Sequence, residues 1–142
     1  MGRILAIDFG KKRCGLAVTD PLKIAANPLE TVETPQLVNY VTAYCSREEV
    51  ERIVVGKPTT MQGELSESNR WLLPAIGRLR KALADKGLTC DIVFSDERFT
   101  SVLAHRAMFD GGLRRKARAD RATVDRVSAA IILNDYLSST QS

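Results

Sequence analysis

The stretch that decides the fold is Arg3-Ile4-Leu5-Ala6-Ile7-Asp8-Phe9. Its apolar run shows no alternation with polar residues, which is typical of a strand buried on both faces of a sheet. Gly10 and a basic triplet follow as a turn. Cys14–Thr19 is then predicted to form a second strand, antiparallel to the first. We therefore expect the chain to begin with a buried pair of strands.

The remaining segments alternate between strands and helices. We expect a weaker third strand over 29–33, strands over 52–56 and 91–95, and helices over 35–46, 66–86, 100–110 and 123–138. Pro74 should kink the second helix or mark its true start, and Gly87 should end it in a left-handed cap. Residues 57–65 are expected to form a loop. Antiparallel strands followed by crossover units predict one α/β domain over 1–142, with a mixed five-stranded sheet and helices on both faces.

Composition limits the class of protein. The 142 residues are enough to bury a core, and 44% hydrophobic with 27% charged residues excludes a wholly disordered chain. No apolar run is long enough to span a membrane, and the first one stops at Asp8, so we expect no signal peptide. The spacing of Cys14, Cys45 and Cys90 fits neither a zinc site nor a disulfide framework, and we expect small buried residues there. These features predict a cytoplasmic protein with no membrane partner.

Positive charge is concentrated in two places. The formal net charge is +4, from 21 Lys and Arg against 17 Asp and Glu. Residues 113–126 alone hold six basic and two acidic side chains, and Lys11-Lys12-Arg13 forms a second cluster. Clustered positive charge indicates a partner with a phosphate backbone, such as a nucleic acid. The alternative for the longer segment is a solvated surface loop.

Three carboxylates are placed where they could meet. Asp8 ends the first strand, on the face that it shares with Ile4 and Ala6. Glu97 comes just after the fifth strand, and Asp125 lies in the first turns of the last helix. Small residues follow Asp125 and would let that helix approach the sheet closely. The three acids are therefore candidates for one site.

Such a group of acids needs a cation, because like charges cannot neutralise one another. Oxygen ligands without cysteine or histidine select Mg²⁺ or Mn²⁺, which can support cleavage of phosphodiester bonds. Each acid also has a simpler interpretation. Asp8 could be a turn residue, Glu97 a surface acid, and Asp125 a favourable charge near a helix N-terminus.

Several stretches form an ordered set of motifs along nearly the whole chain: LAIDFGKKRCGLAV at 5–18, IVVGKP at 53–58, MQG at 61–63, DERFTS at 96–101, and VD at 124–125 leading into SAAIIL at 128–133. In this order they resemble the YqgF (RuvX) family of Holliday-junction-resolvase-like proteins, also described as nucleases of the 16S ribosomal RNA precursor. The resemblance implies a ribonuclease H-like fold, in agreement with the predicted order of strands and helices.

The resemblance also implies an activity and its residues. Asp8, Glu97 and Asp125 correspond to the family's acidic metal site, which implies a Mg²⁺- or Mn²⁺-dependent nuclease that acts on structured nucleic acid. The leading role is processing of the end of pre-16S ribosomal RNA. The residues implied to bind backbone phosphates are Lys11, Lys12, Arg13, Arg98, Arg114, Arg115, Lys116 and Arg118. Arg98 is equally well explained as an ion-pair partner of Asp96.

The chain departs from the family's pattern at three positions. Related resolvases carry a second acid three residues after the last-helix aspartate, where this chain has Ser128. With three acids, a second metal ion is expected to be weak or to arrive with the substrate. Lys57 stands where the family has a hydrophobic residue, and Thr60 where it has asparagine. The substrate preference of that loop is therefore left open.

Other functions compete with this interpretation. A resolvase of branched DNA would use the same fold and metal site, and is expected to act as a homodimer, whereas an RNA-end nuclease could be a monomer. A non-catalytic RNA-binding or transcription-associated module would use the basic segment alone. The Asp-Phe-Gly sequence at 8–10 also resembles a phosphate-binding opening of two-domain ATPases, but one domain supplies only half of such a site. The choice between RNA and DNA, and between endonuclease and exonuclease, stays open.

Overall fold

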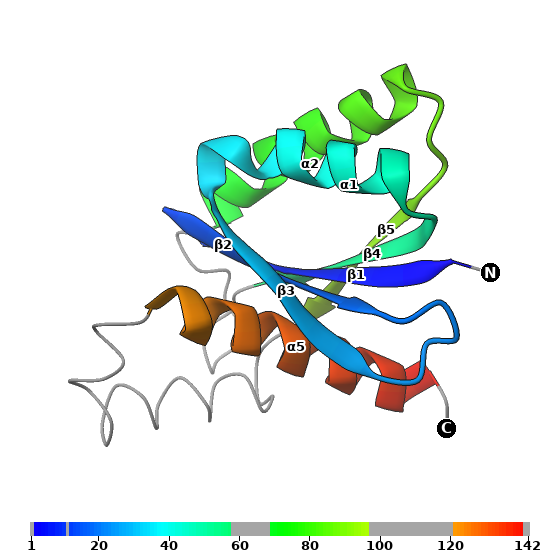
Figure 1. The fold of residues 1–142 in the computed structure, drawn as a ribbon. Coiled ribbons are helices and arrows are strands. Elements are labelled where there is room, and N and C mark those ends of the chain that lie inside the picture. The colour runs from blue at the N-terminus through cyan, green and yellow to red at the C-terminus, as the bar shows by residue number, and fades with distance from the viewer. Residues whose placement is uncertain (1, 11, 58–68, 97–120, 141–142) are drawn as a thin grey trace.

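A five-stranded mixed sheet forms the centre of the protein, in a computed structural model that describes residues 2–10, 12–57, 69–96 and 121–140 (Figure 1). The strands are β1 (Arg3–Asp8), β2 (Arg13–Thr19), β3 (Ala26–Glu33), β4 (Val50–Lys57) and β5 (Asp91–Asp96). Their order across the sheet is β3-β2-β1-β4-β5. β1 pairs antiparallel with β2 and parallel with β4, and β4 pairs parallel with β5. The long apolar strand of the sequence is therefore the central one.

Helices cover both faces of this sheet. The short 3-10 helix η1 (Thr34–Gln36) leads into α1 (Leu37–Arg47), which packs beside α2 (Asn69–Asp85) on one face. The last helix, α5 (Arg121–Thr140), lies across the other face and contacts β1, β2, β3 and β4 (Figure 1). The mixed sheet with helices on both faces is as the sequence predicts.

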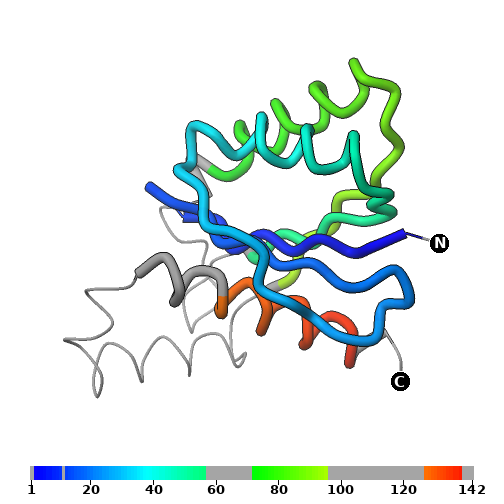
Figure 2. Tube along the Cα trace, viewed as in Figure 1, coloured from blue at the N-terminus to red at the C-terminus, as the bar shows by residue number. Residues whose placement is uncertain are grey.

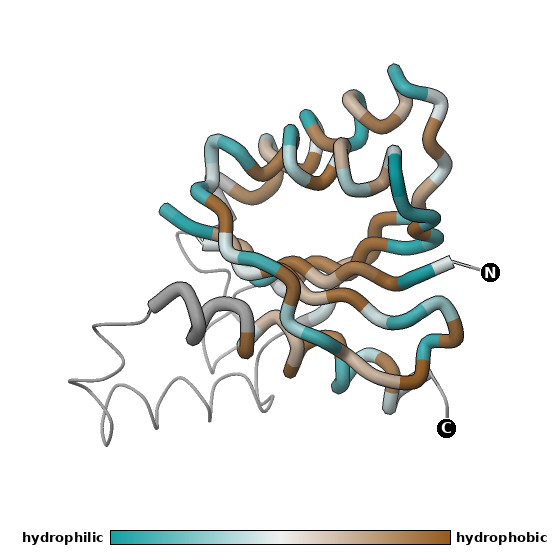
Figure 3. The backbone as a smooth tube through the Cα atoms, in the orientation of Figure 1, coloured by the Kyte–Doolittle hydropathy of each residue, from teal (hydrophilic) through white to brown (hydrophobic). Residues whose placement is uncertain are grey.

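The core divides into two clusters because side chains alternate along each strand. Leu5 and Ile7 of β1 pack toward α1 and α2. Ile4 and Ala6 point the other way, toward Ala129 and its neighbours in α5. Figure 3 shows hydrophobic residues along the central strands, between the helical layers. The apolar run therefore has to be continuous, since both of its faces are covered.

The third strand is longer than predicted. It begins at Ala26 and pairs with β2 as far as Thr19, whereas the sequence predicts a start at residue 29. Pro28 argues against a strand at this point, but β3 is an edge strand, where a missing N–H is tolerated. The pairing is also irregular beside Leu16 and Ala17, close to the proline.

One further boundary differs from the prediction, and one of the two alternatives for Pro74 is excluded. Lys57 is the last residue of β4, where it pairs with Asp96, and does not begin the loop. α2 begins at Asn69, so Pro74 lies inside that helix and does not mark its start. Gly87 follows α2 with a φ of 69°, in the left-handed conformation that glycine favours. The expected helix over 100–110 and most of the expected loop over 57–65 lie outside the described residues.

The cysteines are free thiols. Cys14 and Cys45 are buried, as expected of small core residues, and burial raises the pKa of the Cys45 thiol to about 12. Cys90 is only partly buried, and its Sγ donates a hydrogen bond to the carbonyl of Val50 at 2.9 Å. None of the helices that the structure describes is both long and apolar enough to cross a membrane.

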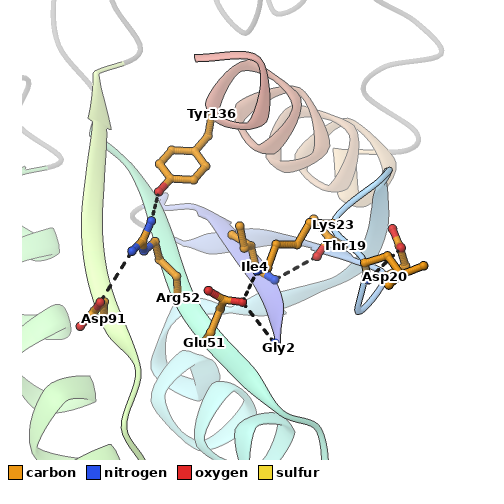
Figure 4. A network of polar contacts seen from close by, with 10 residues as sticks. Gly2, Ile4, Thr19, Asp20, Lys23, Glu51, Arg52, Asp91 and Tyr136 are labelled. Atoms are coloured by element: carbon orange, nitrogen blue, oxygen red, sulfur yellow. Dashed lines mark hydrogen bonds and ion pairs between the residues drawn. The ribbon is translucent and has the colours of Figure 1, made fainter. Parts of the chain in front are cut away.

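A group of polar contacts ties the start of β1 and β4 to their surroundings (Figure 4). Thr19 Oγ1 accepts a hydrogen bond from the backbone N–H of Ile4 at 3.0 Å. Arg52 in β4 contacts both Tyr136 of α5 and Asp91 of β5. All of these contacts lie toward the end of the sheet where β1 begins. The candidate site lies at the opposite end, where β1 terminates.

Candidate metal and nucleic-acid site

Asp8 is the last residue of β1, and only 4% of its surface is exposed. The alternation of side chains puts it on the face of Ile4 and Ala6, which pack against α5. This is the face predicted from the sequence. Burial of a carboxylate is costly unless other groups compensate for the lost water. Asp8 is therefore held at the end of a rigid central strand, in the layer between the sheet and α5.

Glycines flank Asp8 on both neighbouring strands. In the register of the sheet, Asp8 pairs with Gly15 of β2 and with Gly56 of β4, and both glycines are buried. Paired residues in adjacent strands share a face, so no side chain from either neighbour stands beside the Asp8 carboxylate on that face. On that face, the two neighbouring strands therefore present only glycine backbone beside Asp8.

The direction of α5 brings its first turns toward Asp8. Tyr136 bonds Arg52, which pairs with Ile4, so the end of α5 lies over the start of β1. Figure 2 shows the helix running opposite to β1. From Tyr136 back to Asp125 the helix covers about 16 Å, at about 1.5 Å per residue. From Ile4 to Asp8 the strand covers about 13 Å. α5 therefore begins toward the end of the sheet where β1 terminates.

The end of β5 reaches the same edge of the sheet. Gly56 pairs with Ser95 as well as with Asp8, so Ser95 lies two strands from Asp8, roughly 10 Å away. β5 ends at Asp96. Glu97, the next residue, lies outside the described residues. The structure thus places Asp8 at the end of β1, begins α5, the helix of Asp125, toward the same end of the sheet, and ends β5 one residue before Glu97.

Ser128 adds an unexpected polar atom to this region. It lies one turn after Asp125 on the buried face of α5, with 0% of its surface exposed. Its Oγ has no hydrogen-bond partner among the described residues. Buried hydroxyls are nearly always hydrogen-bonded, so this one is suited to a ligand or an ordered water. From the sequence, Ser128 was noted as the place of a missing acid and as one of the small residues that let the helix approach the sheet.

The donor set fits a hard divalent cation. Carboxylate and hydroxyl oxygens are ligands of Mg²⁺ and Mn²⁺, and none of the buried cysteines lies among them. Among residues 2–10, 12–57, 69–96 and 121–140, no three His, Cys, Asp or Glu side chains gather closely enough to hold a metal ion. Glu97 does not belong to that set, and Asp125 is described only by its place in α5. The metal site remains a prediction.

The basic turn between β1 and β2 begins two residues after Asp8. Lys12 is exposed and Arg13, the first residue of β2, is partly buried. The turn is tight, because a Cβ on Gly10 would clash with the carbonyl oxygen of Arg13. The N–H of Thr34 donates a hydrogen bond to the carbonyl of Lys12 at 2.9 Å. The structure therefore places two predicted phosphate-binding residues near Asp8.

The other predicted phosphate-binding residues are not described. These are Lys11, Arg98, Arg114, Arg115, Lys116 and Arg118. The last helix was predicted to begin at residue 123, and α5 begins at Arg121, so the end of the basic segment is helical. Arg121 and Arg126 therefore belong to the helix whose first turns approach Asp8.

Comparison with known proteins assigns the family. The family model described as "RuvX: Holliday junction resolvase" matches residues 2–139. The chain belongs to the RuvX family. A relative from Phocaeicola vulgatus named "Putative pre-16S rRNA nuclease" is 53% identical over 139 residues, which are 98% of this chain and 97% of the relative. A relative of the same name from Bacteroides fragilis is 47% identical over 137 residues, 96% of each chain.

Solved structures identify the fold of this RuvX-family chain. Thermus thermophilus RuvC in complex with a Holliday junction substrate superposes with a TM-score of 0.58 and 19% identity, over 99% of this chain and 96% of that one. A second Thermus thermophilus RuvC structure gives a TM-score of 0.56 and 16% identity, over 98% and 96% of the two chains. The fold is therefore ribonuclease H-like, as the resemblance of the sequence implies.

Proposed function

We propose that this RuvX-family protein is a metal-dependent nuclease that hydrolyses phosphodiester bonds in structured nucleic acid, and that it processes the end of pre-16S ribosomal RNA. The observation that carries the proposal is the buried Asp8 carboxylate, flanked by Gly15 and Gly56 and facing α5. The names of close relatives support the substrate. On this proposal, residues 1–142 form one nuclease domain that works in the cytoplasm.

Asp8, Glu97 and Asp125 would hold the Mg²⁺ or Mn²⁺. When bound, a divalent ion stabilises the negative charge that develops on the phosphate during hydrolysis. Asp8 contributes a carboxylate fixed on the central strand, in surroundings where burial strengthens its attraction for a cation. Ser128 contributes a hydroxyl that can donate a hydrogen bond to a ligand or to water in the same layer.

The basic residues would bind the substrate backbone. Lys12 lies in the turn that follows Asp8 and Arg13 begins β2, so a nucleic-acid strand bound by these two residues passes the end of β1. Phosphate contacts of this kind position a nucleic acid without reading its bases. A structured RNA whose backbone crosses the end of the sheet therefore fits the site.

A second candidate substrate is a four-way DNA junction. It is favoured by the description of the family model and by the fold shared with RuvC. A junction resolvase needs two sites related by symmetry, and hence a homodimer, whereas an RNA-end nuclease can act as a monomer. The oligomeric state under cutting conditions therefore distinguishes the two candidates.

The test uses three labelled substrates: a pre-16S ribosomal RNA fragment, a matched single-stranded RNA and a four-way DNA junction. Each is incubated with Mg²⁺, Mn²⁺ or EDTA, and with wild type, Asp8→Asn or the control Asp20→Asn, which lies on the loop between β2 and β3 away from the site. We expect metal-dependent cutting of the precursor RNA by wild type and Asp20→Asn, and binding without cutting by Asp8→Asn. Binding without cutting by wild type in every metal would instead make the protein a binding module. Cutting of the junction alone would favour the resolvase.

A further inference from the structure

Thr34 holds the basic turn by both of its polar groups. It follows directly after the edge strand β3, as the first residue of η1. Its Oγ1 donates a hydrogen bond to the carbonyl of Gly10 at 2.6 Å, and its N–H donates one to the carbonyl of Lys12 at 2.9 Å. The two accepting carbonyls stand on either side of residue 11. A residue more than 20 positions away along the chain therefore fixes both sides of the turn.

The hydroxyl of Thr34 sits in a crowded, partly buried position. Cys14, which is fully buried, has its Sγ 3.5 Å from Thr34 Oγ1 and 3.9 Å from the Gly10 carbonyl oxygen. Gly10 itself has no room for a Cβ because of the Arg13 carbonyl. The turn is therefore packed tightly from within, and loss of the hydroxyl would leave the Gly10 carbonyl without this donor.

The turn links the two parts of the candidate site. Gly10 follows Asp8 by two residues, and Lys12 and Arg13 follow Gly10. Because β1 is fixed in the centre of the sheet, a bond to Gly10 sets where the two cations stand relative to the Asp8 carboxylate. Charged side chains held in one place bind a phosphate backbone more tightly than mobile ones, since less conformational freedom is lost on binding.

We propose that Thr34 is a positioning residue for nucleic-acid binding: its hydroxyl holds Gly10 so that Lys12 and Arg13 contact the substrate backbone beside Asp8. This inference rests on the proposed function, because it assumes that the basic turn meets a phosphate backbone. A purely structural role for Thr34 would affect the stability of the protein and leave the number of phosphate contacts unchanged.

The test compares three threonine variants. Thr34→Val removes the hydroxyl and keeps the shape, and Thr34→Ser keeps the hydroxyl. Thr42→Val is the matched control, because Thr42 is buried in α1 and its Oγ1 has no hydrogen-bond partner among the described residues. For each we measure thermal unfolding, kcat, KM, and the Kd for the precursor RNA fragment over a range of salt concentrations, below the unfolding temperature of every variant.

We expect the Kd of Thr34→Val for the precursor RNA fragment to rise about five- to tenfold, which is the size of effect expected from the loss of one hydrogen bond. The slope of log K against log salt should become shallower by about 1, which corresponds to one lost phosphate contact. KM should rise in proportion while kcat stays unchanged. Thr34→Ser should restore both affinity and slope, and Thr42→Val should match the wild type.

A double substitution makes the test sharper. In a Lys12→Gln, Arg13→Gln background the cations are already absent, so adding Thr34→Val should weaken binding no further. Thr34→Ala, which removes the same hydroxyl, is the second variant if Thr34→Val does not fold. An unchanged Kd and salt slope in Thr34→Val, or no recovery in Thr34→Ser, would overturn the proposal even if the wild type cuts RNA. If the wild type binds RNA without cutting it, the nuclease function fails and the binding comparison still tests Thr34.

Discussion

Arg52 in β4 donates a hydrogen bond from Nη1 to the phenolic oxygen of Tyr136 in α5, at 2.6 Å. This contact joins residues 84 positions apart and fastens the last turns of α5 over the start of β4. It also raises the pKa of the Arg52 guanidinium, so the cation is retained. Because one end of the helix is fixed there, its first turns extend toward Asp8. The contact thus contributes to holding α5 in its direction across the sheet.

Tyr136→Phe removes this hydrogen bond and keeps the ring. We expect the free energy of unfolding to fall by about 1 kcal/mol, since the bond is partly exposed to water. Chemical denaturation measures the change. Tyr40→Phe is the control, because Tyr40 is partly buried against the other core cluster, away from the Arg52–Tyr136 contact. An equal decrease in the free energy of unfolding in the two variants would contradict the role assigned to the Arg52–Tyr136 contact.

Ser128→Ala removes the buried hydroxyl that lacks a partner among the described residues. Without added metal or substrate, we expect the free energy of unfolding to stay the same or to rise by up to about 1 kcal/mol, because an unsatisfied polar group is removed. The measurement is denaturant unfolding in EDTA, with Ser138→Ala, on the exposed side of α5, as the control. A loss larger than about 1 kcal/mol would show that the hydroxyl is bonded within the protein.

Acid should weaken the loop between β2 and β3 through Asp20. Hydrogen bonds from the backbone N–H groups of Ala25, Ile24 and Leu22 lower the pKa of its carboxyl group. A lowered pKa in the folded state stabilises the protein above the unfolded-state pKa, near 3.8. That stabilisation is lost as the pH falls through the folded-state value.

We therefore expect the Tm of the wild type to fall below about pH 4, the range in which aspartate titrates. Asp20→Asn cannot lose a charge there, so the difference in Tm between the two proteins should shrink with falling pH. Thermal unfolding from pH 6 to pH 2.5 tests this. A difference in Tm that stays constant across that range would contradict the assignment.

Local patterns in the sequence were enough to predict the sheet and the face on which Asp8 lies. The run from Ile4 to Ile7 is apolar on both faces of the strand. Because side chains alternate between the two faces, the face of Asp8 follows directly from those of Ile4 and Ala6. β3 was harder, because its early start depends on pairing with β2, which overrides the effect of Pro28. Lys57 joins β4 for a similar reason, through its pairing with Asp96.

Contacts distant in sequence could not be predicted. Nothing in the sequence around Thr34 indicates that its hydroxyl donates a hydrogen bond to Gly10. Nothing around Tyr136 indicates that it accepts a hydrogen bond from Arg52. Both contacts exist only once the sheet has formed. Ser128 was noticed as a departure from a pattern, but its burial without a partner became visible only when α5 was packed on the sheet. The roles of Glu97 and Asp125 as ligands stay predictions.

The central claim is that the buried Asp8 carboxylate holds a divalent cation needed for cleavage. The most direct measurement is a calorimetric titration of Mn²⁺ into wild type, Asp8→Asn and Asp20→Asn, with cutting of the precursor RNA followed on the same samples. The account predicts that wild type and Asp20→Asn bind Mn²⁺ and cut, and that Asp8→Asn, although folded, does neither. Unchanged Mn²⁺ binding and cutting in Asp8→Asn would contradict it.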